Sequence, residues 1–118
     1  MLGSRAWLGD RSTVVATGQV RIGAGSLVGL ESVLSAAQSI SVGERCLLGD
    51  EVMASDRALT VEDAVRADGE RPLVVRPVVV EDGARVGPRA CLLAGARVGA
   101  GAVVGPREVV GGAVERRQ

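Results

Sequence analysis

The sequence predicts an all-β fold in which one chain winds into a parallel β-helix of triangular coils. An aliphatic residue recurs every six residues in the second half: Val80, Val86, Leu92, Val98, Val104 and Val110. An alanine stands four residues after each of the first four of these aliphatics: Ala84, Ala90, Ala96 and Ala102. A period of six fits neither the 3.6-residue helix nor the two-residue alternation of a strand. Three such units close one triangular coil whose aliphatic side chains point inward.

Small residues are expected at the corners of these coils. The alanines should point inward beside a corner, where no bulky side chain fits. The glycines that follow the aliphatics should accept the backbone conformations that a corner demands. A linker rich in glycine, alanine and valine is the alternative, but such a linker would not hold its aliphatics in phase.

The first half of the chain has the same pattern with longer coils. Leu8, Val28 and Leu48 are each twenty residues apart, and the register slips by two within residues 19–23 and 39–43. The first coils therefore have twenty residues, with one corner widened by two.

The second half has coils of eighteen residues, because Gly87-Pro88-Arg89 recurs as Gly105-Pro106-Arg107. The two halves add up to about five coils, and a strand spacing of roughly 4.8 Å makes a prism some 20–25 Å tall. Known helices built from six-residue repeats wind left-handed, an exception to the usual right-handed crossover. We therefore expect a single left-handed parallel β-helix domain over residues 1–118.

An excursion loop is expected at about residues 55–76, where the pattern breaks. Nine of these 22 residues are charged: Asp56, Arg57, Glu62, Asp63, Arg66, Asp68, Glu70, Arg71 and Arg76. Long loops on rigid repeats usually carry function. A solvated loop without a role is the alternative.

The composition fits a narrow core and excludes several classes of partner. Phe and Tyr are absent and Trp7 is the only aromatic residue, while the net charge of zero argues against nucleic acid. No apolar run is long enough to span a membrane, and no signal peptide opens the chain. Cys46 and Cys91 have neither metal nor redox spacing, so we expect structural cysteines in a reduced, cytoplasmic protein.

The residues five places after the inward aliphatics should face outward, and they differ in polarity. The apolar ones are Leu27, Val33, Leu47, Met53, Cys91, Val103 and Val109. The polar ones are Gln19, Ser39, Arg85, Arg97 and Glu115. A thin prism with apolar outer faces is expected to bury them in a homotrimer.

The order of the motifs resembles the hexapeptide-repeat acyltransferases, especially the galactoside, maltose and polysaccharide O-acetyltransferase branch. The matching segments are Leu47-Leu48-Gly49-Asp50-Glu51-Val52-Met53, then Ser55-Asp56-Arg57, the loop, Arg76-Pro77-Val78-Val79-Val80-Glu81-Asp82-Gly83, and the six-residue repeats of residues 92–105. The resemblance covers nearly the whole chain.

The resemblance implies a site between two subunits of a trimer, with acetyl-CoA as co-substrate lying along the prism. In that family a loop histidine takes the proton of a sugar or polyol hydroxyl, and nearby donors stabilise the developing oxyanion. The cofactor-binding residues that it implies here are Arg85, Ala94, Gly95, Gly101, Gly105 and Pro106.

The chain departs from this family at the catalytic position. Arg57 stands where the family has its histidine, and no histidine occurs anywhere in the sequence. An arginine stays protonated and cannot act as a base. Asp56 is the remaining candidate base, a role that would require its pKa to be raised. The neighbouring charge of Arg57 instead lowers that pKa. The alternative role for Asp56 is a contact with Arg57 that orders the loop.

Further departures affect the cofactor site. Arg85 replaces a tryptophan, Gly111-Gly112 replaces a Thr-Lys pair, and the sequence ends before a segment that often completes the CoA site. No metal is expected. The γ-type carbonic anhydrases of this fold bind zinc through three histidines, and this chain has no histidine. Two functions stay open: an acyl-CoA-dependent O-acetyltransferase, and a non-catalytic trimeric assembly or regulatory module.

Overall fold

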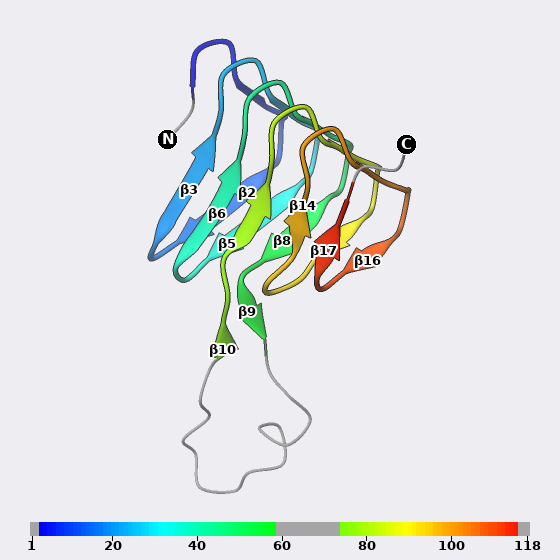
Figure 1. The fold of residues 1–118 in the computed structure, drawn as a ribbon. Coiled ribbons are helices and arrows are strands. Elements are labelled where there is room, and N and C mark those ends of the chain that lie inside the picture. Colours follow the sequence, from blue (N-terminus) through cyan, green and yellow to red (C-terminus); the bar gives the residue numbers. More distant parts are fainter. Residues whose placement is uncertain (1–2, 59–73, 116–118) are drawn as a thin grey trace, which may run out of the picture.

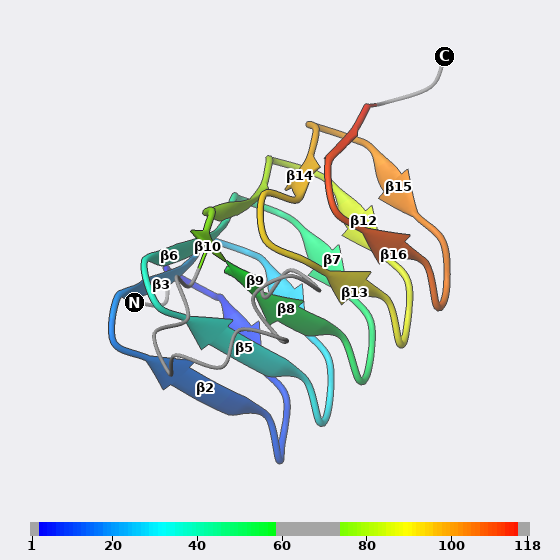
Figure 2. The ribbon, with the colours of Figure 1, turned by 90° about the horizontal axis from the view of Figure 1, so that it is seen from below.

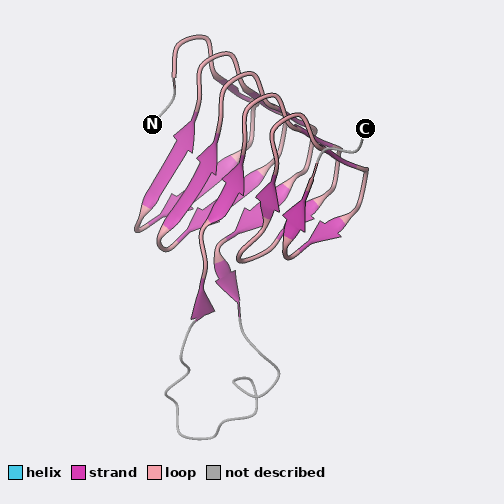
Figure 3. Cartoon of the chain, viewed as in Figure 1, coloured by secondary structure: helices cyan, strands magenta, loops and turns pink. Residues whose placement is uncertain are grey.

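The computed structural model describes residues 3–58 and 74–115. These residues form strands and turns without a helix (Figure 3). Within these two ranges there is no helix with the length and apolar character that a membrane crossing requires.

Three parallel five-stranded sheets form the sides of a triangular prism (Figure 1). Sheet 1 contains β1 (Trp7–Leu8), β4 (Leu27–Val28), β7 (Leu47–Leu48), β12 (Arg85–Val86) and β15 (Val103–Val104). Sheet 2 contains β2 (Thr13–Ala16), β5 (Val33–Ala36), β8 (Met53–Ser55), β13 (Cys91–Leu92) and β16 (Val109–Val110). Sheet 3 contains β3 (Gln19–Ile22), β6 (Ser39–Val42), β11 (Val78–Val80), β14 (Arg97–Val98) and β17 (Ala113–Val114).

Each turn of the chain adds one strand to each sheet in the order 1, 2, 3, so fifteen strands make five coils (Figure 2). The strand register follows the sequence periods, since Leu8 pairs with Val28 and Val86 pairs with Val104. The predicted left-handed parallel β-helix of about five coils is confirmed.

The core consists of the inward aliphatics and small residues that the six-residue period predicts. Leu34 and Val98 are 0% exposed, and so are the corner alanines Ala84 and Ala96. Cys46 is also buried, as a small apolar residue should be. The first coil differs, because no described residue packs over its open end and the inward Val14 is 43% exposed.

The corners make two different demands, a left-handed backbone position and a close approach of the next coil, and different residues meet them at different corners. At the edge between sheets 1 and 2, the left-handed backbone position is filled by charged residues rather than glycine: Arg11, Glu31, Glu51, Arg89 and Arg107. Glycine stands two places earlier, where the next coil approaches closely. A Cβ at Gly49, for example, would lie 2.7 Å from the backbone nitrogen of Pro88. Close stacking of the coils therefore explains this glycine better than backbone conformation does.

The outer faces differ in polarity, as predicted. Leu27, Leu47 and Val103 lie on sheet 1, and Met53 and Val109 lie on sheet 2; all five are exposed. The polar residues Gln19, Ser39 and Arg97 lie on sheet 3. Arg85 departs from this division, because it lies on sheet 1 between Leu47 and Val103.

The excursion interrupts the third coil at the corner between sheets 2 and 3. The chain leaves after β8, and β9 (Arg57–Ala58) pairs antiparallel with β10 (Val74–Val75) as a short hairpin that projects from the prism (Figure 1). It re-enters the prism at β11. The regular strands of the prism therefore end at Ser55 and resume at Val78, and residues 59–73 of the excursion lie outside the described part of the chain.

Replacement of Ala96 by leucine tests the interior packing. The side chain of Ala96 is fully buried, so Ala96→Leu should lower the free energy of unfolding by roughly 1–3 kcal/mol through overpacking. Thermal melting followed by circular dichroism measures the change. The exposed Ala113 on sheet 3 provides the control, since Ala113→Leu should leave the melting temperature nearly unchanged. Equal melting temperatures for all three proteins would contradict the assigned register.

Candidate functional site

The candidate catalytic residues Asp56 and Arg57 lie at the base of the excursion hairpin. The Asp56 side chain is 0% exposed. Its carboxylate accepts hydrogen bonds from the backbone N–H groups of Ala37 (2.8 Å), Gln38 (2.7 Å) and Ser39 (2.9 Å). These three residues form the widened corner of the coil next to the excursion.

Asp56 replaces backbone acceptors that the excursion removes. In the first coil, the N–H groups of Thr17 and Gln19 donate to carbonyls of the second coil, at Ala36 and Gln38. The corresponding N–H groups of the second coil face the place where the third coil departs into the hairpin. The carboxylate of Asp56 accepts them there, so its position is explained by the structure of the corner.

The pKa of Asp56 is unsuited to a general base. Burial alone raises the pKa of this carboxyl, but the N–H donors of Ala37, Gln38 and Ser39 outweigh it and hold the pKa below its ordinary value. A weakly basic, buried carboxylate cannot easily take a proton from an acceptor hydroxyl. A catalytic role for Asp56 stays a prediction that only an activity measurement tests.

Arg57 points away from Asp56. Its backbone N–H donates to Ser55 Oγ at 3.3 Å, and its Nη2 donates to Ser35 Oγ. The expected contact between Asp56 and Arg57 is wrong for the described residues, because the carboxylate turns into the corner while the guanidinium lies outside on sheet 2. Ser35 was not singled out from the sequence, and Ser55 was named only as part of Ser55-Asp56-Arg57, although their twenty-residue spacing places them in register.

The predicted cofactor-binding residues do not converge within one prism. Arg85 lies on sheet 1, whereas Ala94 and Gly95 lie at the corner between sheets 2 and 3. Gly101 precedes sheet 1 at another corner, and Gly105-Pro106 follows sheet 1 at the third. Their proposed role in binding CoA stays a prediction.

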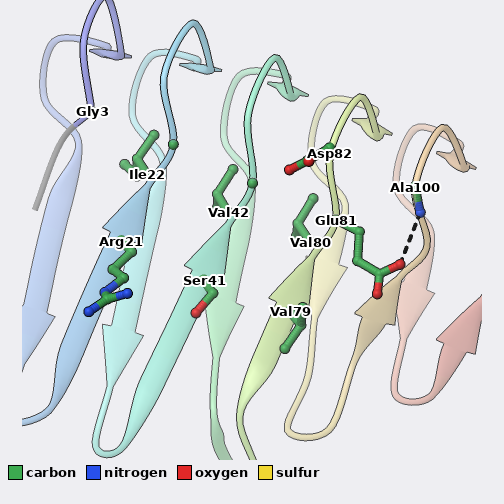
Figure 4. Close-up of a pocket in the computed structure, with 12 residues that line it drawn as sticks. Gly3, Arg21, Ile22, Ser41, Val42, Val79, Val80, Glu81, Asp82 and Ala100 are labelled. Carbon is green, nitrogen blue, oxygen red and sulfur yellow. Dashed lines mark hydrogen bonds between the residues drawn. The ribbon is translucent and has the colours of Figure 1, made fainter.

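A groove of about 740 Å³ runs along the outer side of sheet 3, where its strands end (Figure 4). Arg21, Ser41 and Val79 form a row across β3, β6 and β11 in this groove. Glu81 and Asp82 lie at the corner beside it. This groove is not predicted by the sequence, because its shape depends on how the corners of successive coils stack.

Charged groups border the groove on its corner side. Glu81 accepts hydrogen bonds from Arg97 (2.6 and 3.0 Å) and from the backbone N–H of Ala100 (3.2 Å; Figure 4). The hydrogen bond and charge of Arg97 hold the pKa of Glu81 below its ordinary value. Asp82 accepts the backbone N–H of Glu44 at 2.8 Å. These groups can hold polar parts of a ligand, while the rest of the groove is largely apolar.

Metal and thiol chemistry find little support in the described part of the chain. No three cysteine, histidine or acidic side chains there gather in a way that could hold a metal ion. Cys46 lies in the core, its Sγ is 3.0 Å from the carbonyl oxygen of Glu81, and burial raises the pKa of its thiol. A buried thiol with a raised pKa is a poor nucleophile.

Comparison with known proteins adds a family and a set of solved folds. The family described as the hexapeptide repeat of succinyl-transferase matches residues 19–50 and 77–105, together 61 of the 118 residues. No curated protein matches the sequence significantly.

The solved structures with this fold include two bacterial transferases. The hexapeptide-repeat-containing acetyltransferase VCA0836 from Vibrio cholerae is 23% identical with a TM-score of 0.75, covering 92% of this chain and 64% of that one. Its complex with acetyl coenzyme A gives 21% identity, a TM-score of 0.76, and coverage of 93% and 62%. AntD, an N-acyltransferase from Bacillus cereus solved with dTDP and 3-hydroxybutyryl-CoA, is 12% identical with a TM-score of 0.76, covering 97% and 69%. This chain therefore spans less than two thirds of VCA0836, and the likeness shows a shared fold.

Replacement of Asp56 by asparagine tests its role at the corner. The amide cannot accept all three N–H bonds, so Asp56→Asn should destabilise the protein by roughly 3 kcal/mol at neutral pH. Because the folded-state pKa of Asp56 lies below its ordinary value of 3.8, its stabilising contribution is complete well above pH 3.8 and is lost as the pH falls through the folded-state pKa. Urea unfolding between pH 7 and pH 2 should therefore show a difference from the native protein that shrinks in acid.

The control for this experiment is Asp82→Asn. Asp82 is exposed and accepts one backbone N–H, so its replacement should cost much less. A difference between the native protein and Asp56→Asn that is independent of pH would contradict the assigned ionised acceptor.

Proposed function

Because this chain belongs to the hexapeptide-repeat family, we propose that it is an acyl-CoA-dependent acyltransferase that acetylates a sugar or polyol hydroxyl. The observation that supports this proposal is an excursion hairpin in the third coil of a five-coil β-helix, with Arg57 at its base. Structures with the same fold are known with acetyl-CoA and with 3-hydroxybutyryl-CoA, for VCA0836 and AntD respectively.

We place the acyl-CoA in the groove along sheet 3. The groove crosses the coils from Gly3 to Ala100, which suits an elongated ligand lying along the prism. Its volume of about 740 Å³ lies within the range of ligand sites. Arg21 on one side and the carboxylates of Glu81 and Asp82 on the other provide polar contacts at its borders.

The proposed reaction joins the acceptor oxygen to the acyl carbonyl carbon and breaks the thioester, releasing CoA. The hydroxyl proton must pass to a base, and general-base catalysis is worth about 10²–10⁴ in rate. Arg57 cannot accept this proton, and the low pKa of Asp56 makes its carboxylate a weak base. We therefore expect slow turnover by the native protein.

A second function is favoured by the same two residues. Arg57 stands at the family's histidine position, and Asp56 is held by three backbone N–H groups. A chain that keeps the coil but lacks a working base suits a non-catalytic trimeric assembly or regulatory module. Acetyl-CoA binding discriminates the two functions, because an acyltransferase requires it and a scaffold does not.

We also propose that the protein forms a homotrimer and is located in the cytoplasm. Leu27, Leu47, Val103 and Val109 are exposed on sheets 1 and 2 of a single chain. Their burial between copies would remove a large apolar surface from water. Light scattering of the native protein should give the mass of three chains, and a monomer at micromolar concentration would reject the trimer.

Calorimetry with acetyl-CoA tests the proposed function and its groove. The native protein should bind acetyl-CoA and release free CoA slowly in the presence of sugars or polyols. Ser41→Trp places a bulky ring in the groove and should weaken binding at least about tenfold. Ala113→Trp, an exposed position on the same sheet outside the groove, should bind like the native protein. Equal affinities of the two variants for acetyl-CoA would contradict the placement of acyl-CoA in the groove. No binding of acetyl-CoA by the native protein would reject the acyltransferase function.

In a site shared by two copies of the proposed trimer, with the hairpin of one copy beside the groove of the other, replacement of Arg57 by histidine tests whether only the base is missing. Arg57→His should raise the rate of acetyl transfer, by a measurable part of the 10²–10⁴ available to general-base catalysis. Release of CoA from acetyl-CoA with a panel of sugars and polyols measures the rate. Efficient turnover by the native protein would instead reject the non-catalytic module and indicate another base.

A further inference from the structure

We propose that Arg57, Ser35 and Ser55 form a binding site for an oxyanion, a carboxylate or a phosphate group, on the outer face of sheet 2. In the family that this chain resembles, the position of Arg57 carries a base. Here the same position presents a fixed positive charge together with two hydroxyl groups. The proposal concerns binding and does not require acyl transfer to occur.

The backbone holds Arg57 in a defined place. Its strand β9 pairs with β10, with Arg57 opposite Val75. The residue before it, Asp56, is fixed to the neighbouring coil by three hydrogen bonds and accepts the backbone N–H of Arg76 at 2.9 Å through its own carbonyl oxygen. The guanidinium is therefore presented from the rigid base of the hairpin.

The charge of Arg57 is not neutralised by a carboxylate in the described part of the chain. The three ion pairs found there join Arg11 to Glu31, Arg89 to Glu51 and Arg97 to Glu81. The nearest carboxylate in sequence, Asp56, is turned inward. Arginine has five N–H donors in a planar fork, and Ser35 accepts one of them. The remaining donors can bind an oxyanion through two parallel hydrogen bonds.

The two serines are oriented to contribute donors of their own. Ser35 and Ser55 are paired in register on neighbouring strands of sheet 2, and both are partly exposed. Each Oγ accepts a hydrogen bond from Arg57, one from its Nη2 and one from its backbone N–H. Because Arg57 uses an acceptor position on each hydroxyl, the O–H groups of Ser35 and Ser55 can donate to a ligand. Two O–H donors beside a guanidinium match an oxyanion and repel a cation.

The surface next to this cluster suits the non-ionic part of such a ligand. Val33 and Met53 form the next outward pair on the same two strands, and Met53 is 49% exposed. If the proposed function holds, the oxyanion belongs to the acceptor, as a carboxylate or as a phosphate group.

Titration with inorganic phosphate and with acetate tests the site, at constant ionic strength and with the backbone amide signals of Ser35 and Ser55 followed by NMR. The native protein should show saturable shifts of these signals with at least one of the two anions. Arg57→Gln should weaken that binding roughly tenfold or more, since hydrogen bonds to charged groups are lost. Ser35→Ala should weaken it less, and Arg57→Lys should retain part of it because lysine keeps the charge without the planar fork.

The matched control is Arg107→Gln, an exposed arginine at the edge between sheets 1 and 2. It should bind both anions like the native protein, and all variants should keep the native circular dichroism spectrum. Absence of saturable binding, or equal weakening in Arg57→Gln and Arg107→Gln, would overturn the site. Saturation by acetate alone indicates a carboxylate ligand, and saturation by phosphate alone indicates a phosphate ester.

This titration separates the site from the proposed acyl transfer. Anion binding by a protein that neither binds acetyl-CoA nor releases CoA would support the site and reject the transferase. Release of CoA without anion binding at Arg57 would support the transferase and reject the site.

Discussion

The stacking of coils through backbone hydrogen bonds is the constraint on which the rest of this structure depends. Each coil bonds to the next along all three sheets, so a corner can hold only residues that allow the neighbouring backbone to approach. This explains the fully buried Ala84, Ala90 and Ala96, as well as the glycine at position 49. The narrow interior that results needs no aromatic residue, which accounts for a composition without Phe or Tyr.

The excursion is the place where this constraint is broken and then repaired. When the third coil departs into the hairpin, the N–H groups of Ala37, Gln38 and Ser39 lose the carbonyl acceptors that the equivalent residues of the first coil have. Asp56 supplies a buried carboxylate in their place. Because three N–H donors stabilise its ionised form, the residue that allows the hairpin to leave the prism is also a poor proton acceptor.

The chemistry of the hairpin base follows from this division of roles. Asp56 faces inward and serves the fold, so Arg57 faces outward with its charge unopposed by the described carboxylates. Two serines of sheet 2 accept its N–H groups and extend the polar surface. The groove along sheet 3 lies on another face of the prism, and its acidic groups, Glu81 and Asp82, lie at the corner just after β11, the strand that follows the hairpin. The groove proposed for the cofactor and the site proposed for an anion thus lie on different faces of the same prism.

The sequence alone determined the fold, the coil lengths and the position of the excursion, because six-residue spacing maps directly onto strands and corners. It also predicted the burial of Ala96 and Cys46 and the outward polar positions Gln19, Ser39 and Arg97. Only the tertiary structure decided the direction of Asp56 and Arg57, since adjacent residues at a corner can point to opposite sides of the coil. It also separated Arg85, Gly95 and Gly105 and formed the groove from Arg21, Ser41 and Val79. These arrangements depend on how successive coils stack in space, and the six-residue periodicity of the sequence does not specify that stacking.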